Sequence, residues 1–207
     1  MLHSQAAIKV KDYGAGSKSL QGNERQVKDI ATSALKPPRL AQLLFRLAIY
    51  SKPKVIVDLG ASLGITTIYE ASANKKSKVY TFEGCPETAK IALANFKKAG
   101  LHNIELIEGN LDDTLEKKLN DVESVDFVFF DANHRKEPTL RYFSLCLSKA
   151  NKDSVFIFDD IHWSGEMEEA WEEIKAHPKA LITIDLFYMG LVFFRTNQPK
   201  QHFKLRV

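Results

Sequence analysis

The chain has 207 residues, of which 44% are hydrophobic and 27% charged, a composition typical of one soluble globular domain with a sizeable core. Its net charge of +3 is mild, so the composition does not indicate the concentrated basic surface of a nucleic-acid-binding protein. No apolar stretch reaches membrane-spanning length, and the first residues lack the apolar segment of a signal peptide, so we expect no membrane partner. Two cysteines without a disulfide or metal-ligand spacing, Cys85 and Cys146, favour a reducing compartment, and we expect the cytoplasm.

Two helices are predicted near the start, over Glu24–Leu35 and Arg39–Tyr50, and Pro37–Pro38 separates them because proline ends one helix and is tolerated at the start of the next. Leucines at helical spacing in the second helix predict one face packed on the remaining domain: Leu40, Leu43, Leu44 and Leu47. We expect this helical extension, residues 1–53, to shape the substrate side of a cleft. Within it, Gly14–Ser17 lies too far from any strand to form a phosphate loop and is interpreted as a flexible lead-in.

From residue 54 onward, short apolar runs alternate with stretches of helical periodicity. The apolar runs predict seven strands: Val55–Leu59, Val79–Phe82, Ile104–Ile107, Val125–Phe130, Val155–Phe158, Leu181–Phe187 and Leu191–Phe194. The stretches between them predict helices: Ile65–Ala73, Glu87–Ala99, Leu111–Leu119, Pro138–Lys149 and Gly165–Ala176. The alternation indicates a single α/β domain whose core, residues 54–195, is a doubly wound, mostly parallel, Rossmann-like sheet. The last two strands are too close in sequence for a crossover, so the last strand is expected to run antiparallel.

The first strand leads into a glycine-containing turn, VDLGASLGIT, Val57 to Thr66. Gly60 allows a tight turn that leaves space for a ligand, and Gly64 lets the start of the next helix approach that ligand closely. Asp58 adds a carboxylate, which suits a ligand with a cationic amine. The spacing differs from the three-glycine turn that binds pyrophosphate, which argues against a dehydrogenase. A turn with purely structural glycines is the alternative.

The second strand ends at another acid, Glu83, which lies 25 residues after Asp58. A carboxylate at this place in a doubly wound sheet accepts hydrogen bonds from the two ribose hydroxyls of a nucleotide-like ligand. The alternative is an acid at a helix N-terminus, but Glu87 already fills that role for the following helix. After the third strand, Gly109 and Asn110 either face an adenine edge or form a simple turn.

With these motifs in view, residues 54–195 resemble the class I S-adenosylmethionine-dependent methyltransferases. DLGASLG resembles the D/E-x-G-x-x-x-G signature of that family, and Glu83 resembles its ribose-binding acid. The resemblance implies that S-adenosylmethionine is bound, with its amino acid part against the glycine turn and its adenosine between Glu83 and Asn110. The implied cofactor contacts are Asp58, Gly60, Ala61, Ser62, Gly64, Glu83, Gly84, Asn110 and Asp131. Members of the family often carry Asp where this chain has Asn110.

Two further strands end in acids: FFDANH places Asp131 after one, and FDDIHW places Asp159 and Asp160 after the next. Parallel strands end at the same edge of a sheet, so these carboxylates should converge beside the cofactor. Helix capping explains Asp131 poorly, because the next predicted helix begins near Pro138. Several acids without a counter-cation would cost stability, and a bound divalent cation such as Mg²⁺ or Ca²⁺ would remove that cost.

This arrangement is similar to the metal-dependent O-methyltransferases of the catechol and caffeoyl-CoA type and to related bacterial sugar-tailoring enzymes. The resemblance implies that Asp131, Asp159 and Asp160 hold Mg²⁺ or another divalent cation, although these relatives usually carry D-N or E-D at the second position. It also implies that His134, three residues after the first acid, removes the proton from a hydroxyl of a small-molecule acceptor. A surface histidine without a role is the alternative.

Other functions remain open at this point. A metal-independent methyltransferase acting on RNA, protein or an amine would keep the cofactor motifs, but it would favour an Asn-Pro or Asp-Pro pair with an aromatic residue where this chain has Asp131–His134. A non-enzymatic, cofactor-binding protein would keep the fold without needing the acids. A homodimer is also left open, because Phe203–Val207 can form an edge strand or a strand exchanged between two copies.

Overall fold

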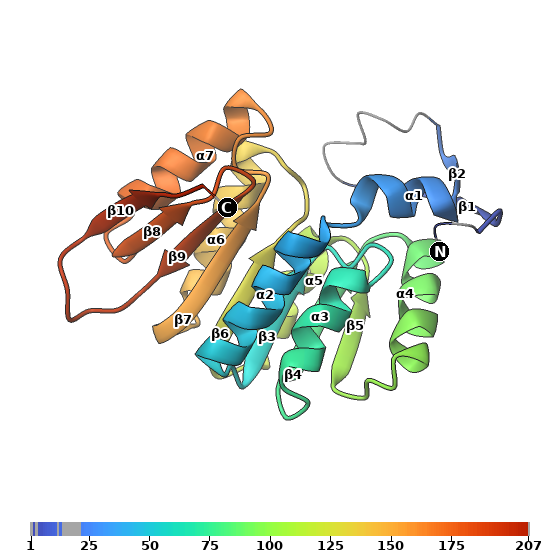
Figure 1. Ribbon diagram of the computed structural model, residues 1–207, viewed down its shortest axis with the longest axis horizontal. Coiled ribbons are helices and arrows are strands. Elements are labelled where there is room, and N and C mark those ends of the chain that lie inside the picture. Colours follow the sequence, from blue (N-terminus) through green and yellow to red (C-terminus); the bar gives the residue numbers. More distant parts are fainter. Residues whose placement is uncertain (1, 3, 12, 14–21, 207) are drawn as a thin grey trace.

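The computed structural model describes residues 2, 4–11, 13 and 22–206; Gly14–Ser17 and Val207 lie outside the described residues. Eight strands form one sheet in the order β10-β8-β9-β7-β6-β3-β4-β5 (Figure 1). Their bounds are β3 Val55–Leu59, β4 Lys78–Glu83, β5 Ile104–Glu108, β6 Val125–Phe130, β7 Ala150–Asp159, β8 Ile182–Asp185, β9 Met189–Phe193 and β10 Gln201–Lys204.

The strand directions confirm the doubly wound α/β fold. Strands β3 to β7 pair in parallel, whereas β9 pairs antiparallel with both β7 and β8. The predicted antiparallel strand Leu191–Phe194 is therefore confirmed as β9. The sheet has one strand more than the seven predicted, because β10 pairs in parallel with β8 of the same chain and forms the edge.

Helices cover both faces of the sheet. Their bounds are α2 Pro38–Ser51, α3 Ile65–Ala73, α4 Pro86–Lys98, α5 Leu111–Asn120, α6 Lys136–Leu147 and α7 Gly165–Ala176. Side chains alternate along each strand, so Phe127 and Phe129 pack in the cluster that contains α2 and α3 residues, whereas Val128 and Phe130 pack with α5, α6 and α7. Among the described residues, no helix combines the length and the apolar character needed to cross a membrane.

The N-terminal extension differs from the prediction in its first part. The expected helix Glu24–Leu35 begins later, as α1 Val27–Ala34, because Glu24–Gln26 forms strand β2 and pairs antiparallel with β1, Ala7–Lys9. Figure 1 shows this small ribbon and α1 grouped together at one end of the molecule. The predicted packing of the second helix is confirmed at its two most buried leucines, since Leu40 and Leu44 belong to the core cluster under α2.

Candidate functional site

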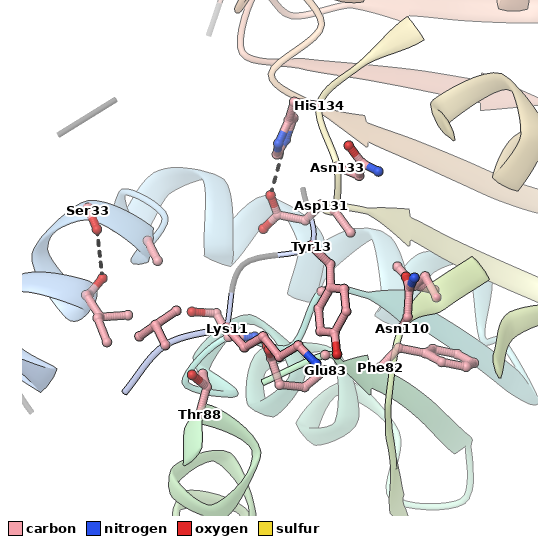
Figure 2. A pocket seen from close by; sticks show the side chains of 18 of the residues that line it. Lys11, Tyr13, Ser33, Phe82, Glu83, Thr88, Asn110, Asp131, Asn133 and His134 are labelled. Atoms are coloured by element: carbon pink, nitrogen blue, oxygen red, sulfur yellow. Dashed lines mark hydrogen bonds and ion pairs between the residues drawn. The ribbon is translucent and has the colours of Figure 1, made fainter. Parts of the chain in front are cut away.

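A cavity of about 440 Å³ lies at the carboxyl ends of the central strands and under the N-terminal extension. Its volume falls within the range of roughly 300–1,000 Å³ that is usual for small-molecule sites. Residues from α1, from the α1–α2 linker and from the tips of β3, β4, β5, β6 and β7 line it. They include Ile30, Ser33, Lys36, Gly60, Ser62, Glu83, Gly84, Asn110, Asp131, His134 and Asp160. In Figure 2, Glu83 and Asn110 lie toward one part of this space and His134 toward another.

Glu83 ends β4 at the wall of the cavity. Its Oε2 accepts a hydrogen bond of 2.8 Å from the backbone N–H of Ser62, and its Oε1 accepts one of 2.8 Å from that of Cys85. Two backbone donors hold the carboxylate in one orientation. The structure therefore places Glu83 beside Ser62 of the glycine turn, at the wall of the cavity.

Asn110 lines the same cavity as Glu83, and so does a residue that the sequence did not single out, Tyr13. Asn110 is the N-cap of α5, and its side-chain oxygen accepts a long hydrogen bond of 3.3 Å from the N–H of Asp112. Tyr13 lies against Gly84: a Cβ on that glycine would be 2.7 Å from Tyr13 Cδ2. Figure 2 shows Tyr13 and Lys11 reaching the cavity near Glu83. Gly84 thus provides room for the tyrosine ring and also lines the cavity.

Asp58 does not line the cavity. Its side chain is fully buried beneath the turn, and its Oδ2 accepts hydrogen bonds of 2.6 Å from Thr67 Oγ1 and 2.7 Å from Thr81 Oγ1. Burial raises the pKa of this carboxyl group, and the two hydroxyl donors oppose that shift. A ligand in the cavity does not reach Asp58 in this conformation, so direct contact with a cationic amine does not follow from the structure.

At the two glycines of the turn, the space that a side chain would fill is next to other protein atoms instead of the expected ligand. A Cβ on Gly60 would lie 2.5 Å from the carbonyl oxygen of Asp131, and one on Gly64 would lie 2.5 Å from Cε1 of Phe96. Both have positive φ, +110° and +79°, which glycine adopts without strain. Gly60 therefore allows β3 to approach β6 closely, and Gly64 allows α3 to pack on α4. Ala61 between them is buried.

The predicted convergence of acids is confirmed for Asp131, which directly follows β6, and Asp159, which ends the neighbouring strand β7. Within the described residues, Asp131, His134 and Asp159 offer possible metal-ligand atoms that all lie within 4.8 Å of one another. Asp160, the third predicted ligand, is not in this group. It has a positive φ of 52°, its side chain is 40% exposed, and it faces the same cavity.

The premise behind the metal prediction, acids without a counter-cation, does not hold in the structure. The ammonium of Lys36, on the linker between α1 and α2, lies 3.1 Å from Asp131 Oδ1 and pairs at short range with Asp159 Oδ2. Burial opposes the charge of Lys36, but the two carboxylates outweigh burial and raise its pKa. For Asp159, burial and the neighbouring Asp131 raise the pKa and Lys36 counteracts them. The three groups form one desolvated ionic cluster.

His134 borders this cluster. Its Nε2 lies 3.6 Å from Asp131 Oδ1 and 3.9 Å from Asp160 Oδ2, and within the described part of the chain this buried nitrogen has no hydrogen-bond partner. Burial lowers the pKa of His134 and outweighs the nearby carboxylates Asp159 and Asp160, which raise it. A neutral imidazole with an unused nitrogen at a cavity wall is able to accept a proton.

Two contributions to the site were missed from sequence. Lys36 stands immediately before Pro37–Pro38, which was interpreted only as a break between helices. A proline favours an extended backbone at the residue before it, but no spacing rule relates Lys36 to acids 95 and 123 residues away. Tyr13 follows a short β-strand whose pairing with β2 is visible only in the fold.

Comparison with known proteins identifies the family of this chain. Residues 57–161, just over half of the chain, match the protein family described as Methyltransferase domain. The chain is 28% identical over 133 residues to a catechol O-methyltransferase of Niastella koreensis, an overlap of 63% of this chain and 59% of that protein. It spans only between half and three fifths of the length of the curated relatives it matches.

Solved structures share the fold. The O-methyltransferase TomG from Streptomyces achromogenes, involved in tomaymycin synthesis and solved in complex with SAM, superposes with a TM-score of 0.69 at 20% identity, over 79% of this chain and 82% of that one. An O-methyltransferase from Bacillus cereus in complex with SAH superposes with a TM-score of 0.66 at 21% identity, over 81% and 88%. These two likenesses support the fold, and the sequence match over residues 57–161 carries the assignment: the chain belongs to the methyltransferase domain family.

Proposed function

We propose that this protein transfers a methyl group from S-adenosylmethionine to a hydroxyl group of a small molecule. The observation that carries the proposal is the continuity of one cavity. Glu83 and Asn110, suited to the adenosine, line the same space as Asp131 and His134, suited to the acceptor. Methyl transfer needs donor and acceptor to meet in one enclosure, because the acceptor oxygen must reach the methyl group directly.

At the cofactor end, the residues of this chain bind and orient. When bound, S-adenosylmethionine supplies an electrophilic methyl group on its sulfonium. Glu83 is already oriented by the N–H groups of Ser62 and Cys85, so its carboxylate is preorganised to accept ribose hydroxyls. The SAM and SAH named with the two similar structures support this choice of cofactor.

At the acceptor end, His134 would remove a proton, and the acid pair, Asp131 and Asp159, would hold a cation. The neutral imidazole is favoured by burial, and its Nε2 faces the cluster without a partner among the described residues. The carboxylates of Asp131 and Asp159 supply oxygen donors of the kind that a divalent cation such as Mg²⁺ prefers, with Asp160 as a further oxygen at the cavity wall, and this leaves His134 Nε2 free of the cation to take the proton. A divalent cation, when bound, would lower the pKa of an acceptor hydroxyl. The catechol O-methyltransferase relative supports a hydroxyl acceptor.

A second candidate is methyl transfer without a metal. It is favoured by the position of Lys36, whose ammonium already pairs with both acids of the cluster. In that case His134 still serves as the base and Lys36 supplies the positive charge beside the acceptor oxygen. RNA, protein and amine acceptors belong to the same metal-independent alternative.

Calorimetric titration with S-adenosylhomocysteine tests cofactor binding. Glu83→Ala should weaken binding roughly 10- to 100-fold, the cost expected for losing hydrogen bonds to a charged group. Glu87→Ala is the matched control, since Glu87 is an exposed acid four residues later that pairs with Lys90. The absence of heat at millimolar ligand in the unaltered protein would remove the proposal.

The acceptor class is tested with radiolabelled S-adenosylmethionine and a panel of catechols, other phenols and sugar alcohols. Product formation that stops in excess chelator and returns with Mg²⁺ or Mn²⁺ supports the metal-dependent form. Product formation that is unchanged by chelator supports the Lys36 alternative. Transfer to RNA, protein or amines, with none to hydroxyl compounds, would contradict the O-methyltransferase proposal.

A further inference from the structure

Lys36 occupies the position of a cation at the acid pair. It is the last residue before Pro37–Pro38 in the linker between α1 and α2, and its side chain is only 14% exposed. The Nζ atom lies 3.1 Å from Asp131 Oδ1 and pairs with Asp159 Oδ2. Because the side chain is enclosed, this pair is not screened by solvent as a surface ion pair would be.

The same two carboxylates are the oxygen donors that a divalent metal ion would use. Asp131 and Asp159 form, with His134, the group of ligand atoms that lie within 4.8 Å of one another in the described residues. An ammonium and a metal ion cannot both contact these two carboxylates, because like charges repel strongly in a site from which water is excluded. Occupation by one cation therefore opposes occupation by the other.

We propose that Lys36 is a tethered cation that competes with a divalent metal ion for Asp131 and Asp159. Lys36 neutralises the carboxylates when no metal is present, and the metal binds when Lys36 withdraws. The inference rests on the cation site of the proposed function, but it concerns binding alone and is tested without methyl transfer. If the lysine charge weakens the metal affinity by a certain factor, removing that charge must strengthen the metal affinity by the same factor.

The position of Lys36 in the chain determines which segment moves when it withdraws. After it, α2 is held in the core by Leu40 and Leu44, which are buried. Before it, α1 contributes Ile30 and Ser33 to the wall of the cavity. Since α1 is itself packed through the buried residues Val27, Ile30 and Ala31, withdrawal of Lys36 moves its own side chain and the short linker rather than either helix.

Titration of the full chain with Mn²⁺ in a calorimeter tests the competition. Lys36→Met and Lys36→Gln should bind Mn²⁺ roughly 5- to 150-fold more tightly than the unaltered protein, the range usual for coupled sites. Lys136→Met is the matched control, because Lys136 pairs with Glu169 and Glu173 instead of the acid pair. The Mn²⁺ affinity of this variant should equal that of the unaltered protein. Adding Asp159→Asn to Lys36→Met should abolish the gain.

Equal Mn²⁺ affinity in the unaltered protein, Lys36→Met and Lys36→Gln overturns the inference, as does the absence of Mn²⁺ binding in all three. Circular dichroism checks the fold, and Lys36→Gln retains a hydrogen-bond donor to the acids in case Lys36→Met does not fold. If neither variant folds, chemical labelling of the Lys36 amine in the unaltered protein decides: Mn²⁺ should raise the reactivity of this amine, because it is enclosed while it pairs with the acids, and unchanged reactivity with Mn²⁺ bound refutes the competition.

The proposed function is tested separately on the same samples. Retained binding of S-adenosylhomocysteine with unchanged Mn²⁺ affinity in the lysine variants removes only the inference about Lys36. Loss of S-adenosylhomocysteine binding in the unaltered protein, together with tighter Mn²⁺ binding in Lys36→Gln, removes the proposed function and keeps the competition.

Discussion

Replacing Gly60 by alanine should destabilise the protein through the backbone of the strand that carries Asp131. The added Cβ would lie 2.5 Å from the carbonyl oxygen of Asp131, 3.0 Å from its carbonyl carbon and 3.3 Å from Ala132 Cβ. The closest of these atoms belong to the backbone directly after β6, where the N–H of Asp131 donates a hydrogen bond to the carbonyl oxygen of Leu59, so they cannot rotate away. The substitution therefore forces β3 and β6 apart at the site.

The expected loss of unfolding free energy has two parts. A non-glycine residue at φ +110° costs about 1–3 kcal/mol in backbone strain. Overpacking against a fixed neighbour costs a further 1–3 kcal/mol or so. Gly100→Ala provides the control: Gly100 also has a positive φ, +65°, but an added Cβ would meet nothing within 4 Å, so only a strain of about 1–2 kcal/mol is expected.

Urea denaturation followed by circular dichroism measures both losses under the same conditions. Gly60→Ala should lower the unfolding free energy by more than Gly100→Ala does, and it should also weaken Mn²⁺ or S-adenosylhomocysteine binding because Asp131 moves. Equal losses in the two variants would show that strain alone matters, and the close approach of β3 and β6 would then not explain the glycine.

Three further predictions concern two buried ionisable groups, Glu70 and His134. Burial raises the pKa of Glu70 well above its usual value, with Asp58 and Asp131 adding to the effect, so its charged form opposes folding as the pH rises. The unfolding free energy of Glu70→Gln should therefore exceed that of the unaltered protein by a margin that grows with pH. Above roughly pH 4.3 the margin should grow by up to about 1.4 kcal/mol per pH unit, until Glu70 ionises in the folded state. Thermal or urea unfolding measures this margin, and a margin that stays constant from pH 4 to 8 would contradict the prediction. His134→Ala should slow methyl transfer by about 10²–10⁴-fold without weakening S-adenosylhomocysteine binding, whereas His162→Ala, outside the cavity lining, should not. Because burial lowers the pKa of His134, the rate of the unaltered enzyme should rise with pH around a midpoint below about 6.5, and a midpoint above that value in a pH–rate profile would argue against this base.

The sequence by itself determined the architecture of the core and the edge at which a ligand binds. Strand and helix periodicities are local, so the alternation from Val55 to Phe193 could be recognised without any tertiary information, and parallel strands necessarily end at one edge. For that reason the meeting of Asp131 and Asp159, and the place of Glu83 at the end of the second core strand, followed from chain order alone.

Other features depended on packing between segments far apart in the chain. Asp58 lies at the predicted turn, but whether its carboxylate faces the cavity or the core depended on Thr67 and Thr81, which hold it inside. Gly64 has the spacing of a ligand-binding glycine, yet the neighbour that requires its missing side chain is Phe96 of α4. Such contacts have no local period, so a pattern identifies the residue without identifying its partner.

The charge balance of the site was decided only by the tertiary structure. From the sequence, the acids at the strand ends lacked a cation, and a divalent metal was the simplest source of one. In the fold, the linker between α1 and α2 brings Lys36 to Asp131 and Asp159 across 95 and 123 residues of sequence. Electrostatic neutrality depends on which charges are near in space, and chain order does not determine that distance for a residue in a linker.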